Sequence, residues 1–135
     1  MGIVYAEITL KNAGDKVRVQ ERLIKEKEVR TVTVRAMADT GCGSLVISEG
    51  IREKLGLAIT GLRRSTGGAK RPCQVTEPVE VHWKNRDAVC RALGLPGAEE
   101  VLLGAIPLED LDLIVDPVRQ ELTGAHGEEA LFMLK

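Results

Sequence analysis

The feature that most constrains the fold is a succession of short β-type segments, each bounded by turn residues. The segments are rich in Val, Ile, Leu and Thr, and they are separated by Gly, Pro, Asn or Asp residues. They span residues 3–12, 29–39, 58–83, 86–95 and 100–117. The longest of them has the pattern of a hairpin. This pattern predicts an all-β barrel or closed sandwich.

One or two short helices are expected among these strands. The clearest helix follows Ser48, a suitable N-cap, and ends at Gly56, where a glycine commonly terminates a helix. A single helical turn is expected around Pro107. The segment 16–23 has alternating valines that predict a strand, and a short helix over residues 20–27 is the alternative.

Length and composition predict one globular domain covering residues 1–135. Nineteen basic and twenty acidic residues leave a net charge of −1, so neither nucleic acid nor an anionic membrane is an expected partner. No apolar run approaches about 20 residues and no signal-peptide pattern opens the chain, which predicts a cytoplasmic protein. The three cysteines form no CxxC pair and the two histidines lie far apart. Neither a metal site nor a cofactor is therefore expected.

An acidic residue, Asp39, lies in a turn of small residues between one predicted strand and the next. Asp and Gly are common turn residues, so an ordinary tight turn is one interpretation of the Asp-Thr-Gly sequence. The other interpretation is half of a catalytic pair, in which two close carboxylates share one proton because both cannot ionise. That chemistry requires a second carboxylate.

The order of the motifs resembles the retropepsin-like family, the retroviral-type aspartic proteases and their single-domain bacterial and archaeal relatives. The resemblance rests on Asp39-Thr40-Gly41 at a strand end, on the hairpin after it, and on Leu102-Leu103-Gly104 before a helical turn. It is clearest over residues 30–117. It implies a retropepsin-like barrel that acts as a homodimeric aspartic endopeptidase on a peptide or protein substrate.

In this family the active-site loop carries the catalysis. The resemblance implies that Asp39 from each of two identical subunits completes the pair, because the chain contains a single Asp-Thr-Gly. Thr40 would hydrogen-bond across the dimer. Gly41, which has no side chain, would let the substrate approach the backbone. Cys42 follows in the loop, at a position where the family usually has Ala or Ser.

The resemblance assigns roles to three other segments. The flap is a hairpin that covers the substrate, and its tip corresponds to Thr66, Gly67 and Gly68. The Leu102-Leu103-Gly104 segment would support the catalytic loop. The apolar segment 128–135 would form a terminal strand that pairs between the two subunits.

Two positions depart from the retroviral pattern. Gly43 and Ala105 occupy the places where retroviral enzymes carry an ion-paired Asp and Arg. The alternative function is therefore an inactive dimer of the same fold that binds peptides or serves in assembly. A thiol enzyme based on Cys42 is disfavoured, because no histidine lies near it in the sequence.

Basic residues flank the predicted flap on both sides, namely Arg63, Arg64, Lys70 and Arg71. One interpretation is that these charges protect an edge strand from aggregation. The other is that they select acidic peptides.

Overall fold

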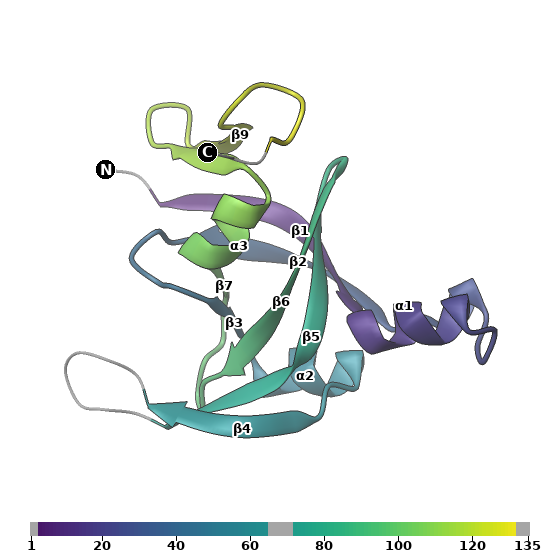
Figure 1. Cartoon of the computed structure of the whole chain (residues 1–135). Coiled ribbons are helices and arrows are strands. Elements are labelled where there is room, and N and C mark those ends of the chain that lie inside the picture. Colours follow the sequence, from purple (N-terminus) through teal and green to yellow (C-terminus); the bar gives the residue numbers. More distant parts are fainter. Residues whose placement is uncertain (1–2, 65–71, 132–135) are drawn as a thin grey trace, which may run out of the picture.

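Most of the molecule is one curved β-sheet, seen in a computed structural model that describes residues 3–64 and 72–131 (Figure 1). Its strands are β1 (Val4–Asn12), β2 (Thr31–Ala38), β3 (Leu45–Ile47), β4 (Ile59–Arg64), β5 (Pro72–Trp83), β6 (Arg86–Gly94) and β7 (Val101–Leu103). They follow the order β1-β2-β7-β3-β6-β5-β4, and an additional pairing of β1 with β5 closes a six-stranded barrel that leaves β4 outside. A separate hairpin consists of β8 (Leu113–Asp116) and β9 (Glu121–Gly124).

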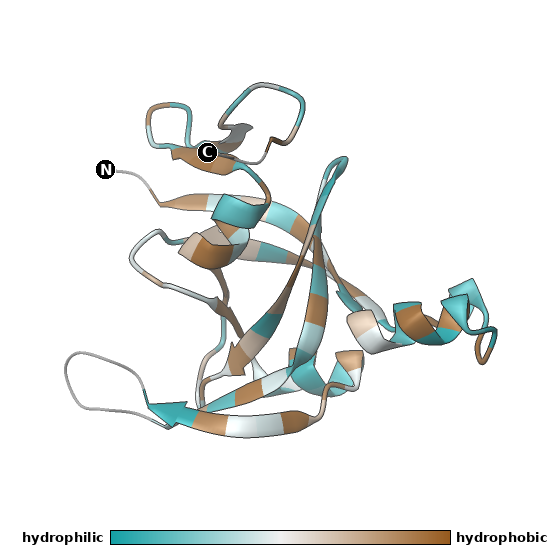
Figure 2. Ribbon diagram, viewed as in Figure 1, coloured by the Kyte–Doolittle hydropathy of each residue, from teal (hydrophilic) through white to brown (hydrophobic). Residues whose placement is uncertain are grey.

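The interior of the barrel is filled by aliphatic side chains. Along β6 most buried residues alternate with more exposed ones, as expected for a strand with one face in the core. Hydrophobic and hydrophilic residues are interspersed along the strands of the sheet (Figure 2). The largest fully buried side chains in the barrel strands are those of Ile8, Leu10, Leu45, Ile47, Leu103, Val4, Val79, Val81 and Thr76. The all-β architecture predicted from the segment pattern is confirmed.

Two helices lie where the sequence places them. Helix α2 (Glu49–Leu55) begins after Ser48, whose hydroxyl accepts a hydrogen bond from the Ile51 N–H at 3.2 Å. It ends at Gly56, which has a left-handed φ of 64°. A side chain at Gly56 would also collide with the Arg30 guanidinium. Helix α3 (Ala105–Asp110) contains Pro107 in its first turn.

The third helix of the described residues, α1 (Ala13–Gln20), corrects the prediction for the segment after β1. Neither a strand over residues 16–23 nor a helix over 20–27 forms there. Instead the Asn12 side chain accepts a hydrogen bond from the Asp15 N–H at 3.0 Å, and its amide donates to the Leu55 carbonyl at 2.7 Å. This cap starts the helix. Val17 is 50% exposed, so the alternating valines do not define a core face. A short 3₁₀ turn follows at Glu26–Glu28.

The first turn of α1 is attached to the barrel through Asp15, which is only 2% exposed. Its carboxylate accepts hydrogen bonds from the Arg30 side chain at 2.9 Å and from the Arg30 backbone N–H at 3.0 Å. Arg18 donates a further bond at 2.8 Å. The hydrogen bonds from the Arg30 side chain lower the pKa of Asp15 to about 2, although burial of the carboxylate acts in the opposite direction.

We expect Asp15→Asn to lower the free energy of unfolding by about 2 kcal/mol at neutral pH. Because the pKa of Asp15 is lower in the folded state, its contribution is complete above the unfolded-state value and is lost as the pH falls towards about 2. Urea unfolding of both proteins from neutral pH to about pH 2 measures this difference. A difference that stays constant across that range would contradict the assignment.

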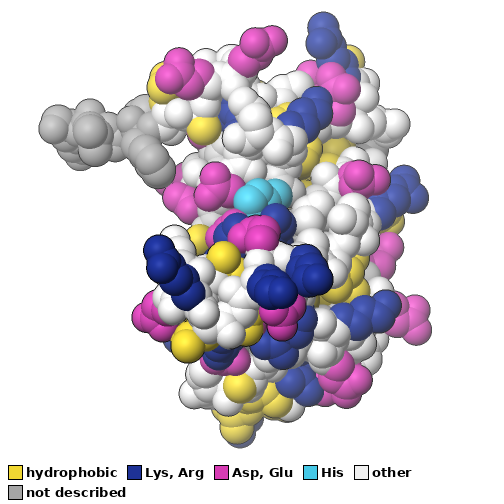
Figure 3. All heavy atoms as spheres, turned by 90° about the vertical axis from the view of Figure 1, so that its right-hand side faces the viewer, with side chains coloured by type: hydrophobic (Ala, Val, Ile, Leu, Met, Phe, Trp, Pro, Cys, Tyr) yellow, Lys and Arg dark blue, Asp and Glu magenta, His cyan; other side chains and the backbone are white. Residues whose placement is uncertain are grey.

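The face of the molecule that bears α1 is highly charged. Lys and Arg side chains are interspersed there with Asp and Glu side chains, and neither sign forms a continuous patch (Figure 3). Among the helices that the structure describes, none combines the length and the hydropathy needed to cross a membrane.

Candidate active site

The loop between β2 and β3 places Asp39 at the end of its strand. The Asp39 N–H donates to the Leu103 carbonyl at 3.0 Å, and the Gly41 N–H donates to one Asp39 carboxylate oxygen at 2.9 Å. The Cys42 N–H donates to the Asp39 carbonyl at 3.1 Å, which closes the turn. The carboxylate is therefore held by the backbone of its own loop and remains half-buried.

The predicted supporting segment lies directly beside this loop. Strand β7 pairs with β2 in parallel and with β3 in antiparallel orientation, so it runs between the two strands that the Asp39 loop connects. Leu103 is fully buried, Leu102 is half-buried, and Gly104 packs against the loop backbone. A Cβ atom at Gly104 would lie 2.3 Å from the Ser44 carbonyl oxygen and 2.5 Å from the Cys42 carbonyl oxygen.

Backbone hydrogen bonds also join the start of α3 to the loop. The Ala105 N–H donates to the Cys42 carbonyl at 2.7 Å, and the Ile106 N–H donates to the Gly43 carbonyl at 2.9 Å. Gly43 and Ala105, where the retroviral pattern has an ion pair, thus each take part in a backbone hydrogen bond between the loop and α3. The loop is anchored without those charges.

The remaining loop residues differ in exposure. Thr40 and Gly41 are exposed, whereas Cys42 is half-buried and its thiol donates to the Ser44 carbonyl at 3.4 Å. The other two cysteines lie in the sheet, where Cys73 is buried and burial raises the pKa of Cys90 to about 11, with a further contribution from Asp110.

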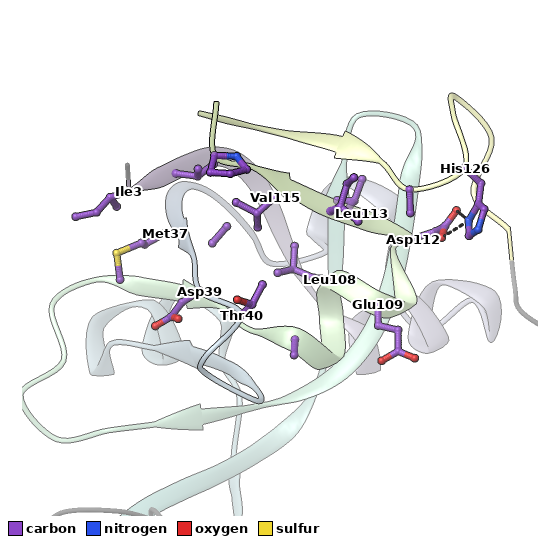
Figure 4. A pocket seen from close by; sticks show the side chains of 16 residues that line it. Ile3, Met37, Asp39, Thr40, Leu108, Glu109, Asp112, Leu113, Val115 and His126 are labelled. Carbon is purple, nitrogen blue, oxygen red and sulfur yellow. Dashed lines mark hydrogen bonds and ion pairs between the residues drawn. The ribbon is translucent and has the colours of Figure 1, made fainter. Parts of the chain in front are cut away.

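A cavity of about 930 Å³ separates the Asp39 loop from the β8–β9 hairpin (Figure 4). Asp39 and Thr40 contribute polar groups to one part of the cavity wall. Asp112 and His126 lie together at another part of it. Between them the walls are mostly aliphatic, from Ile3, Met37, Leu108, Leu113 and Val115. A carboxylate at the edge of a large apolar hollow is an arrangement suited to chemistry or to association.

Polar residues far apart in the sequence hold the β8–β9 hairpin in place. Asp112 is 7% exposed and accepts hydrogen bonds from His126 Nδ1 at 2.8 Å and from the Leu131 N–H at 3.0 Å. The bond from Leu131 and the neighbouring His126 lower the pKa of Asp112. The buried Arg86 side chain donates to the carbonyls of Leu111 and Asp112 at 3.1 and 2.6 Å. The sequence carries no local signal for these pairs.

Three sequence predictions concern segments that are described only in part. The flap-tip residues Thr66, Gly67 and Gly68, together with Lys70 and Arg71, lie outside the described residues. The strands of the predicted hairpin are present as β4 and β5, which pair in antiparallel orientation. Residues 128–131 form no strand within the single chain, where the Leu131 N–H donates to Asp112. Pairing of this segment between two subunits stays a prediction. Residues 132–135 are not described.

No group of three or more His, Cys, Asp or Glu side chains within residues 3–64 and 72–131 could hold a metal ion.

No protein-family model and no curated protein sequence matches this chain. Among solved structures, the retroviral protease-like domain of Ddi1 from Leishmania major matches over 91% of this chain and 88% of its own, with a TM-score of 0.54 and 15% identity. The EIAV protease in complex with the inhibitor HBY-793 matches over 58% of this chain and 77% of its own, with a TM-score of 0.47 and 23% identity. The fold is retropepsin-like, as the order of the motifs predicted.

Proposed function

We propose that this protein is a homodimeric aspartic endopeptidase in which Asp39 of each subunit contributes one carboxylate. The observation that carries the proposal is the position of Asp39, half-buried at the edge of the large cavity and oriented by the Gly41 N–H. Two such carboxylates share one proton across a water molecule. The ionised one acts as the base for the attacking water, and the protonated one donates to the peptide carbonyl.

The second carboxylate comes from a second copy of the chain. A twofold axis places identical residues opposite each other, so an axis beside the loop brings two Asp39 side chains together. Exposed aliphatic residues supply an apolar interface, since Ile3 and Ile114, which line the cavity, are 62% and 53% exposed. Val118, next in sequence to the cavity-lining Pro117, is 90% exposed. The β8–β9 sheet has only two strands in the described part of the chain, and its edges are available for pairing with a copy.

The alternative is the same dimer without peptide hydrolysis, used for peptide binding or for assembly. Gly43 and Ala105, which replace the retroviral ion pair, are the residues that favour it. The backbone bonds from Ala105 and Ile106 to the loop weigh against it, because they hold Asp39 in position by other means. Cleavage of peptides distinguishes the two functions.

We expect Ile114→Lys to dissociate the dimer and to abolish peptide cleavage, because a lysine at the centre of an apolar interface buries an unpaired charge. Val89→Lys is the matched control, since Val89 is also a 53% exposed strand residue but lies on β6 away from the cavity. Solution mass measures association, and mass spectrometry of a digested peptide library measures cleavage.

Wild type and Val89→Lys are expected to be dimeric and active. A monomeric wild type that cleaves peptides would refute the shared active site. A dimer that cleaves nothing across the acidic and neutral pH range would favour the binding alternative.

A further inference from the structure

A second cavity, of about 180 Å³, is lined in part by Ser44 and Leu45, which follow the Asp39 loop. Its lining comes from five elements, namely β3, β4, β5, β6 and α3. The lining residues include Ser44 before β3, Arg63 on β4, Cys90 and Arg91 on β6, and Ile106 on α3. The volume suits one side chain rather than a folded segment of peptide.

Two positive charges border this cavity without a counter-charge. Arg63 and Arg91 are both exposed, and within the described residues neither forms an ion pair or a hydrogen bond through its side chain. By contrast, Arg30 is paired with Asp15 and Arg52 with Glu49. The negative charge of Asp110 contributes to the raised pKa of Cys90, but Asp110 itself does not line the cavity.

We propose that this cavity binds the carboxylate of an Asp or Glu side chain of the peptide substrate. The inference rests on the proposed function and names the substrate class, namely acidic peptides. The two guanidinium groups supply the charge, because arginine matches a carboxylate in geometry and is always ionised. The Ser44 hydroxyl offers a further donor. Leu93 and Ile106 supply apolar walls that can contact the methylene groups of the bound side chain.

The position of the cavity determines where the acidic residue lies in the substrate. Ser44 is five residues from Asp39 in the chain, so the two lie at most about 18 Å apart. An extended peptide covers that length with about five residues. The acidic residue therefore lies a few positions from the cleaved bond. Because a homodimer has two copies of the cavity, the preference appears on both sides of that bond.

The test uses short peptides with an apolar background in which each position in turn carries Glu or its neutral isostere Gln. Wild type is expected to cleave the Glu peptides about tenfold better at the favoured positions. Arg63→Glu combined with Arg91→Glu reverses the charge and is expected to prefer Lys at the same positions. Lys27→Glu is the matched control, because Lys27 is exposed on the 3₁₀ turn, outside both cavities.

A second measurement separates this inference from the proposed function. The same peptides are immobilised, and binding of the Asp39→Asn protein is measured at low and at high salt. Binding that favours Glu, weakens with salt and disappears in the double variant supports the acidic site even when wild type cleaves nothing. Cleavage by wild type without any difference between Glu and Gln overturns the acidic site and leaves the protease intact.

Discussion

Asp39→Asn is expected to abolish peptide hydrolysis while leaving the fold and the dimer unchanged. Asn is nearly isosteric, and its amide oxygen can still accept the hydrogen bond that the Gly41 N–H donates at 2.9 Å. It can neither act as a base nor share a proton with the opposing carboxylate. We therefore expect the rate to fall by about a thousandfold or more.

A mixed dimer with one wild-type subunit tests whether the two carboxylates act as one unit. If they do, a single Asn is almost as damaging as two, because the remaining Asp has no partner with which to share its proton. Differently tagged subunits, co-expressed and purified in two steps, give this mixed dimer for the same cleavage assay. Half of the wild-type activity in the mixed dimer would mean that each subunit carries a complete site.

Asp87→Asn is the matched control, since Asp87 is exposed on β6 and belongs to neither cavity. Its activity should equal that of wild type. Activity is also expected to decline at both ends of the pH range, where the pair either gains a second proton or loses the shared one. Cleavage that survives Asp39→Asn at every pH would identify another catalyst.

Gly104→Ala is expected to lower the free energy of unfolding by about 3 kcal/mol. The backbone conformation of Gly104 is extended, with φ −86° and ψ −174°, so alanine meets no conformational penalty there. The cost is steric. The added Cβ would lie within 2.7 Å of the Ser44 nitrogen as well as close to two loop carbonyls, and none of these backbone atoms can rotate away.

Gly43→Ala is the matched control. It shows whether the lost stability comes from the steric clash at Gly104 or from replacing any glycine in this region. No atom lies within 4 Å of a Cβ built at Gly43. The free energy of unfolding of Gly43→Ala should therefore differ from that of wild type by no more than about 0.5 kcal/mol. Urea unfolding compares the two variants. Activity should fall together with stability in Gly104→Ala, because moving Cys42 and Ser44 also moves Asp39. Equal stability of the two variants would show that the loop backbone moves to accommodate the added Cβ without lowering the free energy of unfolding.

The elements that could be predicted from the sequence are those with signals within a few residues. Ser48 and Gly56 determine both ends of α2 through a cap and a left-handed residue, and neither depends on distant contacts. The small residues around Asp39 and the apolar residues before Gly104 placed a turn and a strand correctly for the same reason. A strand was wrongly predicted for α1, because the exposure of Val17 and the pairing of Asp15 with Arg30 depend on the rest of the barrel.

The sequence alone determined that the chain is built mainly of short strands, that Asp39 lies in a turn, and that the order of the motifs resembles retropepsin-like proteins. Only the tertiary structure decided which groups lie together around that turn. Asp112 and His126 pair across the end of the hairpin, and Arg63 and Arg91 come from different strands to border one cavity. Hydrophobic periodicity and helix capping depend on residues that are close in the sequence. Burial and charge pairing depend on residues distant in the sequence that the closed sheet brings together.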